Sequence, residues 1–331
     1  MTEALLVLWV LSSVFIVFTG KTYRIMILFG VFSLVTSIIY LSLGAPDVAM
    51  AEAGISAFAT IFLIVCIEKY YARGKGLEDE AKKEKATRRY LTKIILPLAF
   101  TALLCGLFFH FMPYGSDYAY PDLRSQYLFG FMEDVGGENA VTAIYLAYRV
   151  YDTLFEALLL VIAVVAVVHL SWYDQKKVKD GRHSEIESSR MTKFTMRIIC
   201  PIILMFGVYL VLNGHISAGG GFLGGLAFAT FLICRFLVLG IYDLPIEKAM
   251  KYEEFVFIGI IIIPIFAIFT GIIYQIPDTA DLFQNVYLIA MSGLIGMKVA
   301  FGFFVLFYRY IAIERLPEKD EEKVVATGTD D

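Results

Sequence analysis

The residues best able to do chemistry in this chain are charged side chains set within long apolar stretches. Asp47 and Glu52 lie in the segment GAPDVAMAEAG at the start of such a stretch, and Ser56 and Thr60 follow Glu52 at spacings of four and eight. Asp47 complements the positive end of a helix dipole and can act as a plain helix cap. Glu52 lies more than one turn further in, where a carboxylate is costly unless it faces protein or water. We therefore interpret Glu52 as a proton-exchanging or ion-pairing group.

A second charged group lies in the segment YRVYDTLFE. On a helix, Arg149, Asp152 and Glu156 share one face, because they are spaced by three and four residues. An arginine flanked by two carboxylates neutralises itself and can also pass protons along. The competing interpretation is a static ion pair that holds two helices together. The surrounding apolar run, 139–172, exceeds one membrane crossing at about 1.5 Å per residue, so we expect an interfacial outer piece followed by a span from about Asp152.

The segment NGHISAGGGFLGG is rich in glycine. It lacks a GK[ST] sequence and a preceding strand, which excludes a phosphate-binding loop. Close packing of helices in a membrane bundle explains its glycines, which include Gly219, Gly220, Gly221, Gly224 and Gly225. His215 lies in the same segment and titrates near neutral pH when unperturbed. It could relay protons at the outer mouth of an ion path, or it could be satisfied by a backbone carbonyl.

Lys298 lies near the middle of a further apolar run, 284–308. An ammonium group at that depth must find a carboxylate, a water-filled cavity or a neutral state. Glu156 and a neighbouring subunit are both candidates for its partner. We interpret Lys298 as a further candidate for an ion path.

The composition identifies the class of protein that must position these groups. The 331 residues are 59% hydrophobic and 18% charged, against roughly 45–50% and 25% in soluble domains, and the mean hydropathy is +0.71. A formal net charge of −4 gives no electrostatic basis for binding nucleic acid. The four cysteines stand singly in apolar runs, so we expect no iron–sulfur cluster or structural zinc in this chain. The sequence predicts an integral membrane protein.

Nine apolar runs approach or exceed the length of roughly 20 residues that a membrane-spanning helix needs. Lysines and arginines outside them gather in alternate connections and in the C-terminal tail. By the positive-inside rule, we predict an all-α multi-pass protein of the cell membrane with its N-terminus outside and its C-terminus in the cytoplasm. The first run lacks a basic leading region and a cleavage site, so we interpret it as a true span. The runs lie near 3–20, 24–44, 47–68, 94–112, 140–172, 197–214, 222–241, 253–275 and 284–308.

Two long charged segments, 71–89 and 174–190, divide these runs into blocks of three, two and four. Both mix acidic and basic residues with few apolar ones, which is typical of solvated linkers. We therefore predict a three-helix unit at 1–90, a two-helix unit at 91–190, and a four-helix unit with a charged tail at 191–331.

The motifs of the three units resemble known signatures in the same order. GAPDVAMAEAGISA resembles the C-terminal membrane region of the large Mrp-type Na⁺/H⁺ antiporter subunit and its separate counterpart in membrane-bound hydrogenases. NAVTAIYLAYRVYDTLFEALLLV resembles the pattern NxVTxIxxxYRGxDTLGE of the adjoining small subunit, with Val150 and Phe155 replacing two glycines. NGHISAGGGFLGG resembles the GHxxPGGGFxGG signature of the B-type Mrp subunit, with Ala218 replacing the proline. The chain looks like a fusion of three neighbouring subunits.

This resemblance implies a membrane subunit of a multisubunit Na⁺/H⁺-translocating complex. The many-span part of the large antiporter protein does not precede the GAPD region here, which favours the membrane arm of a respiratory complex such as a group 4 membrane-bound [NiFe] hydrogenase. [NiFe] and Fe–S clusters are then expected only on partner subunits, and this chain, among other membrane subunits and lipids, contributes to a path for Na⁺ or H⁺. The alternatives are a subunit of a stand-alone Mrp-type antiporter and a structural bridge between antiporter-like and redox modules. The ion-path candidates are Glu52, Asp152, Glu156, Arg149, Lys298, His215 and Asp47.

Overall fold

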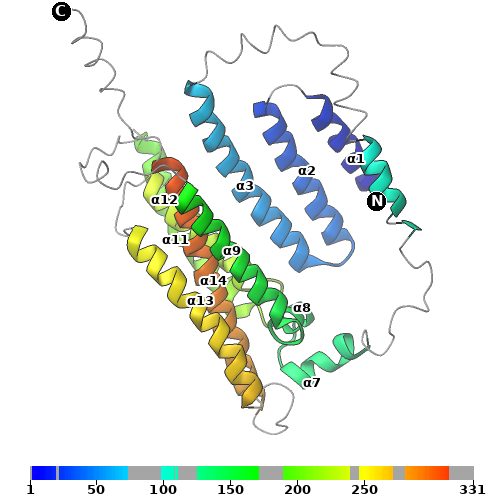
Figure 1. Cartoon of the computed structure of the whole chain (residues 1–331), viewed down its shortest axis with the longest axis vertical. Helices are drawn as coiled ribbons and strands as arrows, with labels where there is room; N and C mark the ends of the chain where they lie inside the picture. Colours follow the sequence, from blue (N-terminus) through cyan, green and yellow to red (C-terminus); the bar gives the residue numbers. More distant parts are fainter. Residues whose placement is uncertain are drawn as a thin grey trace, which may run out of the picture. The chain divides into compact units, whose positions relative to one another are not determined.

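The computed structural model describes residues 2–19, 22–73, 98–107, 109–110, 125–170, 189–238, 246–270 and 280–312. Within these ranges the regular structure is entirely helical (Figure 1). Most of the two predicted charged linkers, and all of the C-terminal tail from 316, lie outside the described residues.

The chain divides into two compact units. The larger comprises Met1–Cys66 and Phe131–Asp331, and the smaller comprises Ile67–Gly130. The described residues of the smaller unit include an apolar helix at Leu98–Leu107 and a π-helical stretch, η2, at Gln126–Gly130. All the site residues discussed below belong to the larger unit.

Six helices in the described ranges are long and apolar enough to cross a membrane. Three shorter apolar helices, Thr2–Phe18, Leu98–Leu107 and Gly221–Phe236, coincide with the remaining predicted runs. The chain is therefore an all-helical multi-pass membrane protein, as its composition predicts. The six candidate spans are Tyr23–Ser42, Pro46–Ile64, Val150–His169, Arg190–Asn213, Lys248–Phe269 and Phe283–Arg309.

The first three helices are α1 (Thr2–Phe18), α2 (Thr22–Ser42) and α3 (Pro46–Arg73). α1 packs on α2, where the Trp9 indole N–H donates to the Thr36 hydroxyl over 2.9 Å. α3 is joined to α2 by the Ser37 hydroxyl, which donates to the backbone carbonyl of Ala49 over 2.6 Å. The chain turns between α2 and α3 at Gly44, whose φ of 77° favours glycine.

The long apolar run 139–172 is broken into separate pieces. A short helix, α8 (Ala140–Ala143), continues into one π-helical turn, η3 (Ile144–Tyr148). The backbone then leaves helical geometry at Arg149, with φ −119° and ψ 36°. The membrane-length helix α9 follows at Val150–Leu170. The run is thus divided close to the predicted position, since α9 begins two residues before Asp152.

Besides the short helix α7 (Phe131–Val135), the described part of the larger unit contains four further helices: α11 (Arg190–Asn213), α12 (Gly221–Leu237), α13 (Ile246–Phe269) and α14 (Ala280–Ala312). α12 packs against both α11 and α14, while α14 also packs against α13 and α9. α14 is thus the central helix of this group, and well over half of its apolar window is buried.

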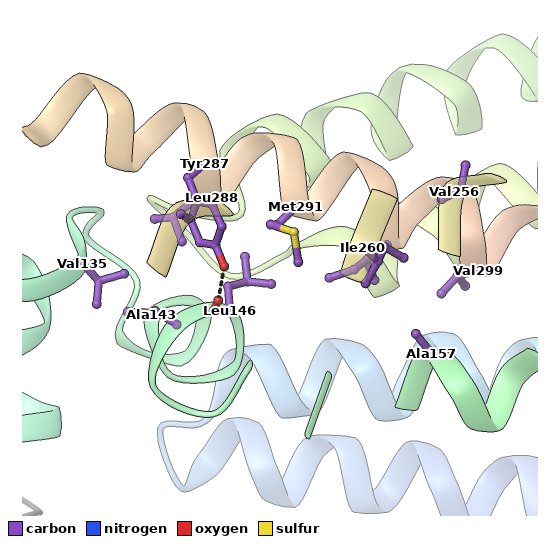
Figure 2. Close-up of a cluster of buried hydrophobic side chains, with 13 residues drawn as sticks. Val135, Ala143, Leu146, Ala157, Val256, Ile260, Tyr287, Leu288, Met291 and Val299 are labelled. Carbon is purple, nitrogen blue, oxygen red and sulfur yellow. Dashed lines mark hydrogen bonds between the residues drawn. The ribbon is translucent and has the colours of Figure 1, made fainter. Parts of the chain in front are cut away.

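The main apolar core lies where α13, α14 and α9 meet the irregular segment α8–η3 (Figure 2). Leu146, Ile260 and Met291 are completely buried in it. The π-helical turn leaves backbone carbonyls without regular partners, and the Tyr287 hydroxyl donates to one of them, that of Leu146, over 2.7 Å. The irregular segment just before the YRVYDTLFE motif is therefore anchored on α14.

Candidate functional site

The three sequence motifs meet at one hydrogen-bonded junction. Its centre is the Asn139 side chain, whose amide nitrogen lies 3.1 Å from a carboxylate oxygen of Asp47, 3.2 Å from the carbonyl of Gly214 and 2.9 Å from that of Ser217. These partners come from α3 and from the glycine-rich loop before α12. We call this group the motif junction; it comprises Asp47, Asn139, Thr142, Gly214, Ser217 and Gly219.

Asn139 uses both ends of its amide. Its oxygen accepts from the backbone N–H groups of Val141 and Thr142, at 2.9 and 3.4 Å, so that it caps the start of α8. The Thr142 hydroxyl in turn donates to the carbonyl of Gly214 over 2.6 Å. Asn139 and Thr142 are both buried. Asn139 was not among the predicted site residues, although an asparagine immediately before an apolar run is a recognisable N-cap signal.

Asp47 does more than cap its own helix. Besides the Asn139 amide, its carboxylate accepts the backbone N–H of Gly219 over 3.1 Å. Gly219 lies just before the N-terminus of α12, where backbone N–H groups favour a negative charge. The half-buried Asp47 carboxylate therefore joins the first block of helices to the glycine-rich loop.

His215 borders the motif junction mainly through its backbone. Its carbonyl accepts the N–H groups of Glu138 and Asn139, at 2.8 and 3.0 Å. Its side-chain Nδ1 is buried and has no hydrogen-bond partner among the described residues. The sequence left open that a backbone carbonyl accepts a hydrogen bond from the imidazole. Within the described residues, the structure shows no such bond at Nδ1.

Tyr145 is a further residue of this region that sequence reasoning missed. Its hydroxyl lies near the side chains of Thr142 and Ser292. It is also so close to Gly220 that a Cβ there would be only 2.3 Å away. Burial raises the pKa of the Tyr145 phenol, and the negative charges of Asp47 and Glu156 act in the same direction. Nothing in the sequence distinguishes this tyrosine from its neighbours in the run IYLAY.

The glycines of the loop allow close backbone contacts. Gly220 has a φ of 111°, which favours glycine. On α12, an added Cβ would lie 2.3 Å from the Ser292 carbonyl oxygen at Gly221 and 2.5 Å from the Gly296 carbonyl oxygen at Gly225. Gly224 faces α11 instead, where a Cβ would come within 2.4 Å of Val211. α12 is thus held between α11 and α14 at nearly backbone contact, a geometry that small residues permit in membranes.

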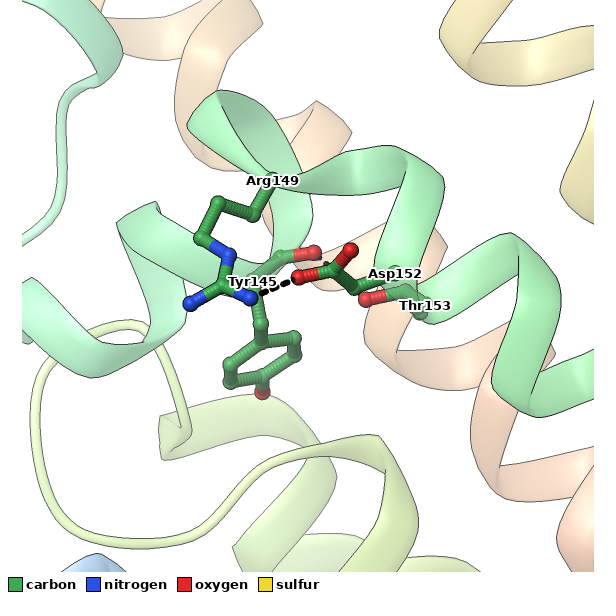
Figure 3. Close-up of polar contacts among 4 residues, drawn as sticks. All are labelled: Tyr145, Arg149, Asp152 and Thr153. Atoms are coloured by element: carbon green, nitrogen blue, oxygen red, sulfur yellow. Dashed lines mark hydrogen bonds and ion pairs between the residues drawn. The ribbon is translucent and has the colours of Figure 1, made fainter. Parts of the chain in front are cut away.

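Arg149 and Asp152 form an ion pair with each other (Figure 3). Their side chains are 62% and 56% exposed, and Glu156 on the same helix is also exposed. The hydroxyl of Thr153, on the buried side of α9, donates to the carbonyl of Tyr145 over 2.5 Å and supports the break at Arg149. The charged face of α9 therefore points outward from this chain.

Glu52 faces the neighbouring helix α2. Its carboxylate accepts a hydrogen bond from the hydroxyl of Ser33, which is 2% exposed. Thr60, which shares a helix face with Glu52, packs against Gly30 of α2. The polar face of α3 recognised from the spacing Glu52–Ser56–Thr60 is thus turned at least in part toward α2.

Lys298 forms an ion pair with Glu253 of α13, not with Glu156 as one of the sequence-based candidates had it. The two side chains are 1% and 4% exposed. Glu253 stands at the first residue of the predicted apolar run 253–275, a position normally read as the membrane interface. Because α13 begins earlier, at Ile246, Glu253 lies inside the helix and can reach a lysine on α14.

The structure therefore distributes the predicted site residues over several places. Asp47 and His215 belong to or border the motif junction, Arg149 pairs with Asp152, Glu52 bonds to α2, and Lys298 bonds to α13. Within the described ranges, His, Cys, Asp and Glu side chains form no group of three or more that could hold a metal ion. The carboxylates in this arrangement can accept protons or pair with cations, and the lysine ammonium can donate a proton or pair with an anion.

Two family descriptions match separate parts of the chain. Residues 191–314 match the domain related to the MnhB subunit of Na⁺/H⁺ antiporter, and residues 7–71 match MbhD, the family described as the D subunit of MBH. A putative antiporter subunit mnhB2 of Staphylococcus haemolyticus is 30% identical over 82 residues, which are 25% of this chain and 58% of that protein. A putative antiporter subunit mnhA2 of Staphylococcus aureus is 26% identical over 180 residues, 54% of this chain and 21% of that protein. The chain thus spans only part of each of these relatives.

Two solved structures resemble the fold. One is the membrane-bound sulfane sulfur reductase, an archaeal respiratory membrane complex, in which the matched chain is 27% identical with a TM-score of 0.52; the match covers 66% of this chain and 96% of that one. The other is the Mrp complex from Dietzia sp. DQ12-45-1b, with 17% identity, a TM-score of 0.63 and coverage of 91% and 34%. Residues 7–71 thus match the MbhD family and residues 191–314 match the MnhB-related domain, and over these parts the chain is similar to Mrp-type antiporter subunits.

Proposed function

We propose that this chain forms part of the path by which Na⁺ or H⁺ crosses the membrane in a multisubunit respiratory complex of the membrane-bound hydrogenase type. Its match to the MbhD family and its similarity to a chain of a respiratory membrane complex support this assignment over a stand-alone antiporter. The redox reaction, with its [NiFe] or Fe–S centres, takes place on partner subunits. Neighbouring membrane subunits, lipids and the transported cations are its partners.

The observation that carries this proposal is the setting of Glu52. This carboxylate lies within the apolar span Pro46–Ile64, and its described hydrogen-bond partner is the buried hydroxyl of Ser33. A hydroxyl can donate to an ionised carboxylate and can accept from a protonated one. Both protonation states of Glu52 are thus accommodated at lipid depth, as reversible proton or cation exchange requires.

The other path candidates are proposed in the same role, at different points. Asp47 and His215 lie at the motif junction, and Asp152 and Glu156 lie on the exposed face of α9. That face is available to a neighbouring subunit, which would bury the charges. Arg149 holds Asp152 in place, and Lys298 with Glu253 supplies a buried acid–base pair.

The proposed membrane arrangement has nine spans, with the N-terminus outside and the C-terminus in the cytoplasm. The three shorter apolar helices, which coincide with predicted runs, support the higher count. We further propose units at 1–90, 91–190 and 191–331. The limits of the two family matches, 7–71 and 191–314, support the outer two.

Replacement of Glu52 by glutamine in the assembled complex tests the proposal. Glutamine keeps the size and a hydrogen-bonding amide but removes the titratable charge, so we expect most of the Na⁺ or H⁺ movement coupled to turnover to be lost. Ser33→Ala leaves the carboxylate in place without its partner and is expected to reduce coupling less. The measurement is ion flux into proteoliposomes per redox turnover, with Glu3→Gln, at an exposed position of α1, as the control. Unchanged coupling in Glu52→Gln removes Glu52 from the path.

A structural bridge is the second candidate function. The motif junction favours it, because hydrogen bonds through Asn139 and Asp47 tie all three motif segments together. In that case Glu156→Gln weakens assembly with partner subunits, while intact complexes keep their normal ion stoichiometry. Quantifying co-purified subunits alongside ion flux separates the two functions.

A further inference from the structure

An apolar groove runs along α11 and α12 on the side where α3 lies. Its volume is about 630 Å³. It follows α11 from Met196 to Leu210 and α12 from Leu223 to Val238, with α3 side chains from Met50 to Ile61 along the other wall. Thr230, one of its few polar lining residues, already donates to the carbonyl of Leu226 over 2.9 Å. The groove therefore offers almost no polar group to a ligand.

The dimensions of the groove restrict what can occupy it. Between Met196 and Leu210 it extends for about 21 Å at 1.5 Å per residue, which exceeds half of a hydrocarbon core about 30 Å thick. Water needs two to four polar partners to stay in such a space, so a single hydrocarbon chain fits best.

Basic side chains border one end of the groove. Lys193 and Arg197 are exposed on the first two turns of α11, one turn before and one residue after the lining residue Met196. Arg235 lies in the last turn of α12, next to the lining residue Cys234. Clusters of lysine and arginine beside membrane helices attract anionic lipid headgroups. The groove thus has an apolar body and a basic end.

We propose that this groove binds one acyl chain of an anionic phospholipid, whose phosphate group is held by Lys193 and Arg197. The lipid fills the seam between α3 and the helices α11 and α12. This assignment does not depend on the proposed ion path, since it concerns lipid binding alone. It accounts for the apolar space beside the place where the Gly54 backbone approaches the Leu226 side chain.

Photo-crosslinking in the assembled complex tests the proposal. The complex is reconstituted in vesicles of equal phosphatidylglycerol and phosphatidylcholine, with p-benzoylphenylalanine in place of Ile61 in the groove, or in place of Ile258, which is exposed on α13. Mass spectrometry then identifies the adducts. We expect phosphatidylglycerol to be enriched over phosphatidylcholine at position 61, and the two lipids to appear in bulk proportion at position 258.

Charge variants separate the headgroup site from general attraction to the membrane. Lys193→Gln and Arg197→Gln are each expected to lower the phosphatidylglycerol enrichment at position 61 by roughly fivefold. The matched pair Lys248→Gln and Lys251→Gln, exposed on the first turns of α13, is expected to leave it unchanged. These surface substitutions do not enter the apolar core, so folding is preserved.

Three results would overturn the proposal. A peptide adduct from another subunit at position 61 would show that protein fills the groove. Equal adduct ratios at positions 61 and 258 would show ordinary surrounding lipid only. Enrichment that persists in Lys193→Gln and Arg197→Gln would exclude these residues as the headgroup site.

Discussion

Lys298 of α14 and Glu253 of α13 form a buried ion pair at the centre of the helix packing. The two side chains are 1% and 4% exposed, and the Lys298 ammonium also lies 5.0 Å from the centroid of the Phe257 ring. Either charge alone would be costly at lipid depth. Together they form a neutral pair, so the contact between α13 and α14 depends on both.

Removal of one partner should destabilise the protein strongly. In Glu253→Gln the Lys298 ammonium stays buried without its counter-ion, and we expect a loss of about 3–5 kcal/mol in the free energy of unfolding. Thermal unfolding of the purified complex, followed by size-exclusion chromatography, measures this loss. Glu254→Gln is the matched control, because Glu254 is the exposed neighbour of Glu253.

The same pair allows a rescue experiment. Replacing both partners by apolar residues, as in Glu253→Leu with Lys298→Met, leaves no unpaired charge and is often neutral in stability. We expect the double variant to be more stable than Glu253→Gln. If Glu253→Gln is as stable as Glu254→Gln, the ion pair does not hold the two helices together.

The contact between α12 and α14 should be destabilised by the addition of a single methyl group. In Gly225→Ala the new Cβ would lie 2.5 Å from the backbone carbonyl oxygen of Gly296, and the backbone cannot move aside without separating the helices. Overpacking of this kind costs about 1–3 kcal/mol or more. Gly293→Ala on α14 is the control, because nothing lies within 4 Å of its Cβ position. Equal melting temperatures for the two variants would contradict the packing described.

Loss of the Asn139 side chain should loosen all three motif segments together. Asn139→Ala removes the cap of α8 and the donor to Asp47, Gly214 and Ser217, and a lost cap alone costs about 1 kcal/mol. Hydrogen–deuterium exchange is expected to rise in the glycine-rich loop and in α8. Asn213→Ala is the control, because the described hydrogen bonds of Asn213 are accepted by its backbone carbonyl and not by its side chain. We expect the hydrogen–deuterium exchange of this variant to equal that of the unaltered protein. A local increase confined to α8 would mean that the junction does not couple the segments.

The contacts among the predicted site residues could be foreseen only in part, for a definite physical reason. Arg149 and Asp152 are close in sequence on one helix, and their ion pair was expected from a spacing of three residues. Glu253 and Lys298 are separated by 45 residues, and their pairing depends on how α13 and α14 are rotated about their axes. Helical periodicity in the sequence shows which residues share one face of a helix. It does not show how two neighbouring helices are rotated relative to each other.

The motif junction, too, could be predicted from the sequence only in part. The sequence marks GAPD, NAVT and GHISAGGG as unusual segments, because their caps, glycines and charges interrupt apolar runs. It contains no sign that the Asn139 amide connects them, since a neutral side chain at a helix start is satisfied equally well by its own backbone. The exposed direction of Glu156 likewise follows from the packing of α9 on α14.

The sequence by itself determined that this is a helical membrane protein, where its apolar helices run, and which antiporter family its motifs resemble. These properties are local, because the thickness of the hydrocarbon layer and the need to satisfy every backbone group act on each segment separately. Only the tertiary structure decided which charges meet: Lys298 with Glu253, Glu52 with Ser33, and Asp47 with Asn139 and Gly219. Those contacts join distant segments, and their geometry is fixed by close packing at residues such as Gly221 and Gly225, which no single helix specifies.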